Sequence, residues 1–410
     1  MTLFCGIDWA ETHHDVAIID DTGTVVAKGR IGDDAAGFAR LLDLFAEAGD
    51  TAGTSIPVGI ETDHGLLVAA LRATGRTIYA INPLSASRYR ARHQVSGAKS
   101  DAADAVMLAN IVRTDADAHR PLPADTDLAQ AVRVLARAQQ DAVWGRQQLG
   151  NQIRSLLKEF YPAALDAFAG QPDGGLARRD ARTVLAAAPT PTLAARLTRA
   201  RLRTLLTKAG RRRNIDHDVD RLYGVFRADR LRLPPVVENA MGIQFSALLN
   251  QFEAACVAAD SLAEATRTHF EQHPDAEIIT SFPGLGLLVS ARVLAEIGDD
   301  RARFTDPRGL KAYAGSAPIT RASGRKKVIQ HRHIKNRRLA AVGPIWALSS
   351  LKASPGARRH FDTRRAAGDW NHQAQRHLFN KFLGQLHHCL QTGCLYDEHQ
   401  AFPPPLTTAA

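Results

Sequence analysis

Two apolar, β-branched runs in the first quarter of the chain each end on a carboxylate. Residues 3–7 precede Asp8, and residues 56–60 precede Glu61. Runs of this kind, bounded by polar and turn-forming residues, predict buried strands. In a mixed α/β sheet, ligands collect at the carboxyl ends of strands. We therefore expect both carboxylates at one edge of a sheet.

A second pair of carboxylates opens the next predicted helix. Asp101 and Asp104 lie three residues apart, so both project from one helical face, and Ser100 before them is a suitable N-cap. Four carboxylates brought together repel one another unless a cation neutralises them. Oxygen ligands of this kind suit Mg²⁺, and also Mn²⁺. Taken singly, each residue also fits a surface charge or a helix cap, so the hypothesis of a metal site depends on the combination.

The stretches between these carboxylates predict the rest of a small mixed sheet. Residues 15–19 and 25–31 are expected to form strands around a turn at 21–23, and residues 77–81 a further strand. Helices are expected near residues 38–45 and 66–73. Residues 84–99 contain no acidic residue and are predicted to form a basic loop beside the carboxylates, with nucleic-acid contacts at Arg88, Arg90, Arg92 and Lys99.

The middle of the chain is predicted to be helical. Leu149, Ile153, Leu156 and Phe160 repeat with the spacing of a coiled-coil seam, which predicts a long helix over 128–160. Its expected partner is a helix over 235–272, with shorter helices between them. Such helices either space domains and join protomers or pack within one chain, and the sequence leaves both open. The role of residues 161–234 is also left open.

The C-terminal part carries a long one-sided charge. There are thirteen Lys and Arg and no acidic residue between Asp306 and Asp362, and the whole chain has a net charge of +10. A stretch of this kind predicts contact with the phosphates of a nucleic acid. The expected contacts are Arg321, Arg325, Lys326, Lys327, Arg332, Lys335, Arg337 and Arg338. Upstream, Gly284 and Gly286 fit a helix-hairpin-helix turn on a DNA backbone, or a plain tight turn between helices.

Ser323 is a candidate nucleophile within this basic stretch. It stands next to Gly324 in a predicted loop over 320–327, flanked by cations that can stabilise a phosphate under attack. A serine hydroxyl needs a base or a metal to take its proton. The ordinary alternative is a turn serine that hydrogen-bonds a phosphate. Ser316 and Tyr313 are rival hydroxyl groups.

Several motifs resemble those of bacterial insertion-sequence transposases. Gly6-Ile7-Asp8, Ile60-Glu61-Thr62, Asn82-Pro83 and the segment from Lys99 to Ala105 resemble their N-terminal DEDD domain. Phe282–Gly286 and Tyr313–Arg338 resemble their C-terminal transposase domain. The resemblance implies an α/β RuvC-like, RNase H-type domain over 1–115 and a linker with a long-helix, coiled-coil region over 116–272. It also implies a mostly α-helical transposase domain over 273–400. Residues 401–410 are expected to be a disordered tail.

The same resemblance implies a mechanism. Asp8, Glu61, Asp101 and Asp104 would hold Mg²⁺, and Ser323 would become joined to a DNA 5′-phosphate during strand exchange. A noncoding bridge RNA would pair with donor and target DNA, and a homodimer would assemble into a tetramer on the DNA. Such an enzyme is expected in the bacterial cytoplasm, associated with the nucleoid when active. No apolar run reaches the roughly 18 residues of a membrane span, so no membrane partner is expected.

Three other functions fit parts of the sequence. A RuvC-like, metal-dependent nuclease would use the same carboxylates with water as its nucleophile. The Gly6-Ile7-Asp8 segment followed by a hairpin also resembles the first phosphate loop of sugar kinases and actin-like ATPases. A non-catalytic nucleic-acid-binding protein would need the basic stretch but none of the four carboxylates.

Overall fold

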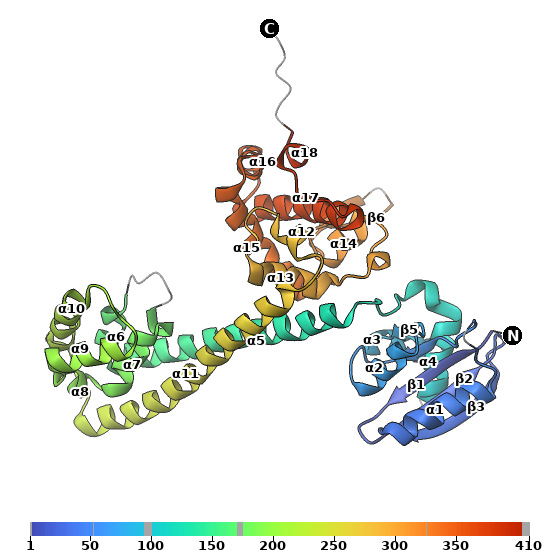
Figure 1. The fold of residues 1–410 in the computed structure, drawn as a ribbon, viewed down its shortest axis with the longest axis horizontal. Helices are drawn as coiled ribbons and strands as arrows, with labels where there is room; N and C mark the ends of the chain where they lie inside the picture. Colours follow the sequence, from blue (N-terminus) through green and yellow to red (C-terminus); the bar gives the residue numbers. More distant parts are fainter. Residues whose placement is uncertain (1, 52, 94–100, 170–174, 325, 404–410) are drawn as a thin grey trace, which may run out of the picture. The chain divides into compact units, whose positions relative to one another are not determined.

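The computed structural model describes residues 2–51, 53–93, 101–169, 175–324 and 326–403. The chain divides into two compact units, Met1–Ala124 and Asp125–Ala410. The first contains a mixed α/β sheet and the second is mostly helical (Figure 1), as the sequence predicted. The first unit extends past the expected boundary at residue 115, because Leu122 N–H donates to the Ile78 carbonyl (2.7 Å) and Pro121 bridges to Tyr79.

Five strands form the sheet of the first unit in the order β3-β2-β1-β4-β5. The β1–β2 and β2–β3 pairs are antiparallel, whereas β1–β4 and β4–β5 are parallel. The strands are β1 (Phe4–Trp9), β2 (His13–Ile19), β3 (Val25–Gly32), β4 (Val58–Ile60) and β5 (Ile78–Ala80). The helices are α1 (Ala35–Glu47), α2 (Leu66–Ala73), α3 (Pro83–His93), α4 (Asp101–Asp115) and the 3₁₀ turn η1 (Ala116–Ala118).

The two faces of this sheet are covered by different helices. Cys5 and Ile7 of β1 are fully buried in one core with Leu41 of α1 and Leu71 of α2. The alternate residue Gly6 faces α4, since a Cβ placed there would lie 2.0 Å from the Ala105 carbonyl oxygen. Gly59 of β4 has the same role, with the Leu108 carbonyl oxygen 2.8 Å from such a Cβ. Two glycines in neighbouring strands therefore let α4 lie directly on the sheet.

One secondary-structure prediction in this unit was wrong. Residues 84–93, which the sequence predicted as part of a basic loop over 84–99, belong to helix α3. Ala86 is buried on Ile81 and Met107, so an apolar contact with α4 holds the segment in a helix although its charge pattern is one-sided. The rest of the predicted loop, including Lys99, lies outside the described residues, as does the predicted N-cap Ser100.

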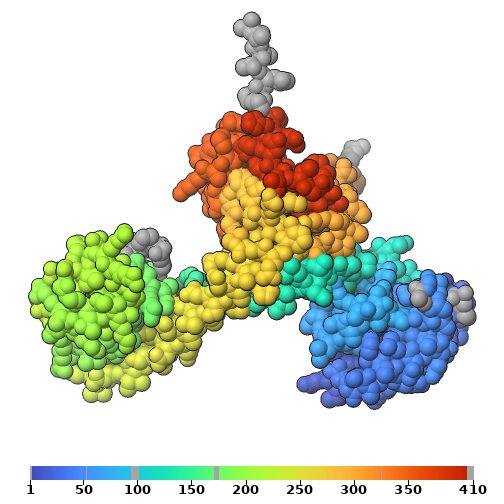
Figure 2. Space-filling view, viewed as in Figure 1, coloured from blue at the N-terminus to red at the C-terminus, as the bar shows by residue number. Residues whose placement is uncertain are grey.

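The second unit is built around two long helices. These are α5 (Asp127–Phe160) and α11 (Pro235–Glu271), close to the predicted ranges. Between them in the chain lie α6 (Pro162–Ala167), η2 (Gly175–Ala177), α7 (Arg179–Ala187), α8 (Pro191–Ala195), α9 (Arg199–Lys208) and α10 (Ile215–Arg227). Figure 2 shows this green segment gathered against the yellow start of α11.

The predicted seam of α5 is buried inside the chain. Ile153, Leu156 and Phe160 share a core with Phe245 and Leu249 of α11 and with the short helices α6–α10. The packing therefore satisfies this part of the seam within one chain, which confirms the intramolecular alternative for these residues. The helices α6, α7, α8, α9 and α10 pack in the same core.

The remaining elements form a second core in this unit. They are α12 (Ala276–Thr280), α13 (Leu287–Ile297), η3 (Arg301–Arg303), α14 (Pro307–Tyr313), β6 (Ile319–Ser323), β7 (Lys326–Gln330), α15 (Arg337–Ala353), α16 (Pro355–Ala366), α17 (Asn371–Thr392) and α18 (Glu398–Ala401). Trp346 and Phe382 stack at 5.1 Å between ring centroids in its centre. None of the described helices combines the length and apolar composition that a membrane span requires.

Two further predictions are corrected by this unit. The expected loop over 320–327 is a β-hairpin, in which β6 and β7 pair antiparallel. The expected disordered tail does not begin at residue 401, because Ala401 and Phe402 are buried in the core. Phe402 packs on Phe382, with ring centroids 6.0 Å apart. Residues 404–410 lie outside the described part of the chain.

We expect Gly6→Ala to destabilise the first unit by about 3 kcal/mol or more, because the new methyl group would overlap the α4 backbone. Urea denaturation followed by circular dichroism measures this loss. Gly53→Ala is the matched control, since nothing lies within 4 Å of a Cβ at that position. Equal stability of the two variants would contradict the close approach of α4 to the sheet.

Candidate active site

The strand register brings Asp8 and Glu61 next to each other. Ile7 of β1 is aligned with Ile60 of the parallel strand β4, so the residues that follow them, Asp8 and Glu61, are neighbours at the carboxyl ends of these strands. Each stands two residues after a glycine that faces α4. Because successive side chains of a strand point to opposite faces of the sheet, Asp8 is directed to the face that α4 covers. Glu61, which follows the last residue of β4, is directed to the same face. Both residues are partly buried.

A third carboxylate at this edge was not singled out from the sequence. Asp15 is the antiparallel partner of Asp8 across β1 and β2, and it is 8% exposed. One carboxylate oxygen each of Asp15 and Asp101 and a ring nitrogen of His13 lie within 4.8 Å of one another. This is a geometry that can hold a metal ion. The signal in the sequence was an acidic residue at the start of an otherwise apolar strand, opposite Asp8 in a hairpin.

Arginines compensate the carboxylates of this cluster. Arg30 of β3 donates from Nε and Nη2 to the two oxygens of Asp15, at 3.2 and 2.9 Å. These hydrogen bonds and the charge of Asp15, with a smaller contribution from Asp101, raise the pKa of Arg30. Arg30 therefore stays charged beside the cluster and offsets part of its repulsion.

Asp104 is held by a second arginine. It is 4% exposed, and Arg90 of α3 donates from Nη2 to its Oδ1 at 2.6 Å. A buried carboxylate needs such a partner. Arg90, expected from the sequence to contact nucleic acid, thus has a carboxylate partner in this structure. Arg88 and Arg92 of the same helix are exposed.

The two glycines before α13 differ in their surroundings. A Cβ on Gly284 would lie 2.4 Å from the Ser350 backbone nitrogen of α15, and its φ is +81°. Packing against α15 and a left-handed backbone therefore explain this glycine. Gly286 is the N-cap residue of α13, and no atom lies within 4 Å of a Cβ placed there. Of the two, Gly286 leaves the backbone open to an outside ligand.

The three candidate hydroxyl groups have different environments. Ser323 is exposed at the end of β6, paired with Lys326 next to the turn at Gly324. Ser316 is 4% exposed and hydrogen-bonds the Lys311 carbonyl and the Asn380 amide nitrogen, at 3.2 and 2.9 Å. The Tyr313 hydroxyl contacts Arg303 and Asn336. Only Ser323 among the three presents an exposed side chain.

The predicted basic contacts fall into two groups. Arg321, Lys326, Lys327 and Arg337 are exposed, whereas Arg325 lies outside the described residues. The others have partners within the chain. Arg338 donates from Nη2 to both oxygens of Asp141 at 2.9 Å, Arg332 donates to the Ala317 carbonyl, and Lys335 contacts His331 at 2.8 Å. Among the predicted contacts over 321–338 that the structure describes, the hairpin and the first residue of α15 therefore carry the exposed positive charge.

A buried glutamate anchors the segment that follows the hairpin. Glu296 of α13 accepts two hydrogen bonds from Arg137 of α5, both 2.8 Å, and one from Asn336 at 2.6 Å. Asn336 in turn caps α15 by accepting from Leu339 N–H. Burial acts to raise the pKa of Glu296, but the hydrogen bond and charge of Arg137 outweigh it and hold that pKa below the ordinary value of a glutamate.

The known proteins whose sequences match this chain include insertion-sequence transposases. Residues 5–162 match the DEDD transposases of IS110, and residues 276–362 match the transposase family of IS116, IS110 and IS902. A protein of Streptomyces coelicolor whose name is mini-circle transposase for IS117 is 62% identical to this chain. The match covers all of this chain and 99% of that protein. The 42 kDa protein of IS900 from Mycobacterium paratuberculosis is 27% identical over all of this chain and 99% of its own.

These matches, together with a carboxylate-edged sheet and a mostly helical second unit, define an insertion-sequence transposase. The chain belongs to the family of the IS116, IS110 and IS902 transposases. The resemblance deduced from the motifs is thereby confirmed. The likeness to sugar kinases is confined to the segment Gly6-Ile7-Asp8 and the hairpin that follows it. Transposases act on DNA, so DNA is a partner of this protein.

We expect Glu296→Gln to lower the melting temperature at neutral pH, and the difference from wild type to shrink as the pH falls below about 4.5. A carboxyl whose pKa is lowered by folding stabilises the protein above its unfolded value and loses this effect when it is protonated. Melting curves between about pH 7 and pH 3.5 test this. Glu264→Gln, at an exposed ion pair, is the control. A difference independent of pH would contradict the assignment.

Proposed function

We propose that this transposase exchanges DNA strands at a metal site formed by Asp8, Glu61, Asp101 and Asp104. The observation that carries the proposal is the register of the sheet, which makes Asp8 the neighbour of Glu61 on the face covered by α4. Asp101 and Asp104 lie in the first turn of that same helix. The strand order β3-β2-β1-β4-β5 supports an RNase H-type, RuvC-like fold for this unit.

The donor set fits a hard divalent cation. Its members are carboxylate oxygens, with Asp15 and His13 close to Asp101, and Mg²⁺ or Mn²⁺ favours such ligands. A bound cation would supply Lewis-acid stabilisation of the charge on a phosphate under attack. Arg30 and Arg90 hold Asp15 and Asp104 in place through direct hydrogen bonds.

In the proposed reaction, Ser323 is the nucleophile. Its Oγ attacks the phosphorus of a DNA phosphodiester, and the bond from phosphorus to the 3′ oxygen breaks. The products are a phosphodiester between Ser323 and the 5′-phosphate end and a free 3′-hydroxyl, which takes up the proton lost by the serine. The exposed position of Ser323, beside Lys326, supports this role, whereas the buried hydrogen bonds of Ser316 fit a structural one.

The proposal includes an RNA guide and an assembly. A noncoding bridge RNA pairs with donor and target DNA, and base pairing supplies the choice of sequence. The exposed cations Arg321, Lys326, Lys327 and Arg337 support contacts with phosphates. Four copies of the chain act together, with the carboxylates of one copy and the serine of another in each site.

We expect wild-type protein, incubated with element-end DNA, guide RNA and Mg²⁺, to form a covalent protein–DNA adduct that survives denaturation. Ser323→Ala abolishes the adduct, because the attacking oxygen is removed, whereas the matched control Ser316→Ala retains it. Denaturing electrophoresis of end-labelled DNA measures both. Adduct formation by Ser323→Ala would disprove the nucleophile, and DNA cleavage without any adduct in wild type would favour water.

We expect Glu61→Gln to reduce strand exchange by at least about 100-fold, since the loss of one ligand charge weakens stabilisation of the transition state. Binding of DNA and RNA stays within about twofold of wild type, because phosphates meet the basic residues rather than the carboxylates. Glu47→Gln, at an exposed ion pair on α1, is the control and leaves both unchanged. Full exchange by Glu61→Gln would support a non-catalytic function for the four carboxylates.

A further inference from the structure

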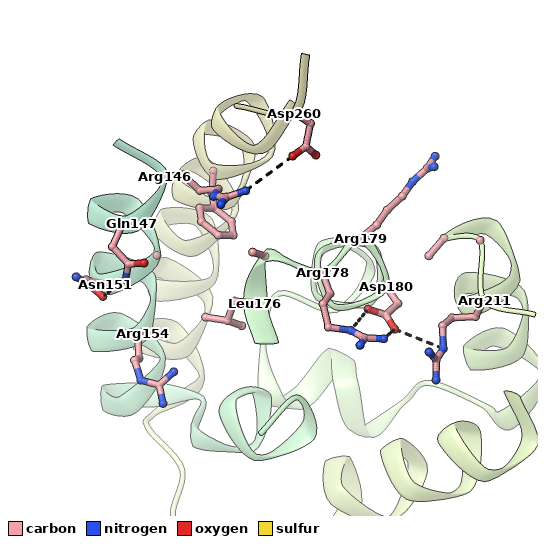
Figure 3. Close-up of a pocket in the computed structure, with 15 residues that line it drawn as sticks. Arg146, Gln147, Asn151, Arg154, Leu176, Arg178, Arg179, Asp180, Arg211 and Asp260 are labelled. Carbon is pink, nitrogen blue, oxygen red and sulfur yellow. Dashed lines mark hydrogen bonds and ion pairs between the residues drawn. The ribbon is translucent and has the colours of Figure 1, made fainter. Parts of the chain in front are cut away.

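A cleft of about 770 Å³ opens in the helical segment whose role the sequence left unassigned. One wall is α5, with Arg146, Gln147, Asn151 and Arg154. The opposite wall is formed by the start of α7 and the turn after α9, and Figure 3 shows the side chains of both walls around the opening. Leu176 and Phe252, both buried, form apolar parts of the lining.

The charge of this cleft is strongly one-sided. Five arginines line it, and only two carboxylates, Asp180 and Asp260, stand among them. Two more exposed arginines, Arg212 and Arg213, directly follow the lining residue Arg211 in the chain. Arg146, Arg178 and Arg211 lie within ion-pair distance of a carboxylate, and the other two arginines leave the cleft with an excess of positive charge. The cleft is therefore suited to an anion, and it is unsuited to a metal cation or an apolar ligand.

The carboxylate of Asp180 serves to orient the arginines around it. Arg178 donates from Nε and Nη2 to its two oxygens, at 3.0 and 2.7 Å, and Arg211 lies 3.6 Å from it. Burial acts to raise the pKa of Asp180, but the hydrogen bond and charge of Arg178 lower it overall, so the group is ionised. Arg211 also pairs with the buried Asp218. These two guanidinium groups are thus held rigidly in the wall.

Arg154 and Arg179 differ from those two. Neither side chain forms a hydrogen bond or ion pair with any other residue that the structure describes, and both are exposed. Arg154 belongs to the α5 wall and Arg179 to the first turn of α7. Two unpaired guanidinium groups therefore stand in opposite walls, beside two that are fixed in position. Gln147 and Asn151 add uncharged donors between them.

We propose that this cleft binds the phosphodiester backbone of a nucleic acid. Guanidinium groups bind phosphate oxygens in pairs of parallel hydrogen bonds, and the cleft offers several of them in two facing walls. This role goes beyond the proposed strand exchange and does not depend on it, because backbone binding requires neither the four carboxylates nor Ser323. The helical segment over 162–227 would then be a second nucleic-acid contact, separate from the basic hairpin.

The test compares two double variants of the full-length protein that lose the same charge. Arg154→Ala/Arg179→Ala removes the unpaired arginines of the cleft. Arg196→Ala/Arg201→Ala removes two exposed arginines of the same helical segment that do not line it. Fluorescence anisotropy with labelled duplex DNA, single-stranded DNA and single-stranded RNA of arbitrary sequence is measured over a range of salt concentrations.

We expect the cleft variant to bind at least about tenfold more weakly, with a salt slope reduced by about 0.9 per lost duplex contact or 0.7 per single-strand contact. The control variant keeps nearly all of its affinity. The probe that shows the larger loss identifies DNA or RNA as the occupant. Equal losses in both variants, or no loss in the cleft variant with any probe, would overturn the proposal.

Substitutions at Asn151 test the same cleft without removing an arginine, so a folding defect of the double variant would not affect them. Asn151→Glu places a carboxylate on the exposed face of α5 within the cleft. Asn151→Gln is its control, because glutamine has the size of glutamate but no charge. We expect binding to weaken in the first and to be unchanged in the second, with equal melting temperatures. Equal binding by both would contradict a phosphate in the cleft. Loss of adduct formation with intact cleft-dependent binding would count against the proposed chemistry alone.

Discussion

The close contact of α4 with the sheet is the constraint on which the first unit depends. A side chain at Gly6 or Gly59 would overlap the backbone of that helix, so the sequence requires glycine at the centre of two neighbouring strands. The same contact fixes the first turn of α4, with Asp101 and Asp104, over the face on which Asp8 and Glu61 lie. Apolar packing thus places Asp101 beside Asp15, two charges that would separate if left to themselves.

Arginine has two distinct roles in this chain, and they differ in whether a carboxylate of the protein lies beside the guanidinium group. Arg90, Arg137 and Arg338 each donate to a carboxylate of the protein, so their positive charge is compensated within the fold. Arg154, Arg179 and the exposed cations of the β6–β7 hairpin have their guanidinium or ammonium groups at the surface. A count of basic residues along the sequence therefore overstates the charge available to phosphates, because carboxylates of the protein already pair with some of these arginines.

Strong local patterns predicted most of the fold. The strands that carry Asp8 and Glu61 and the helices α5 and α11 were expected close to their observed bounds, because apolar periodicity and turn residues determine them locally. The prediction failed where a distant contact decides the structure. Helix α3 depends on Ala86 packing against α4, and the order of Phe402 depends on Phe382. Asp15 and Arg30 join the carboxylate cluster through strand pairing. The cleft of the helical segment depends on the tertiary fold, and no sequence motif predicts it.

Binding of Mn²⁺ to the full-length protein tests the central claim most directly. Electron paramagnetic resonance distinguishes free from bound Mn²⁺ during a titration, without DNA or RNA. If the four carboxylates form one site, wild type shows saturable binding, Asp8→Asn and Asp104→Asn lose it, and Asp43→Asn, at an exposed position of α1, keeps it. The same number of ions bound with the same affinity in all four proteins would contradict the account.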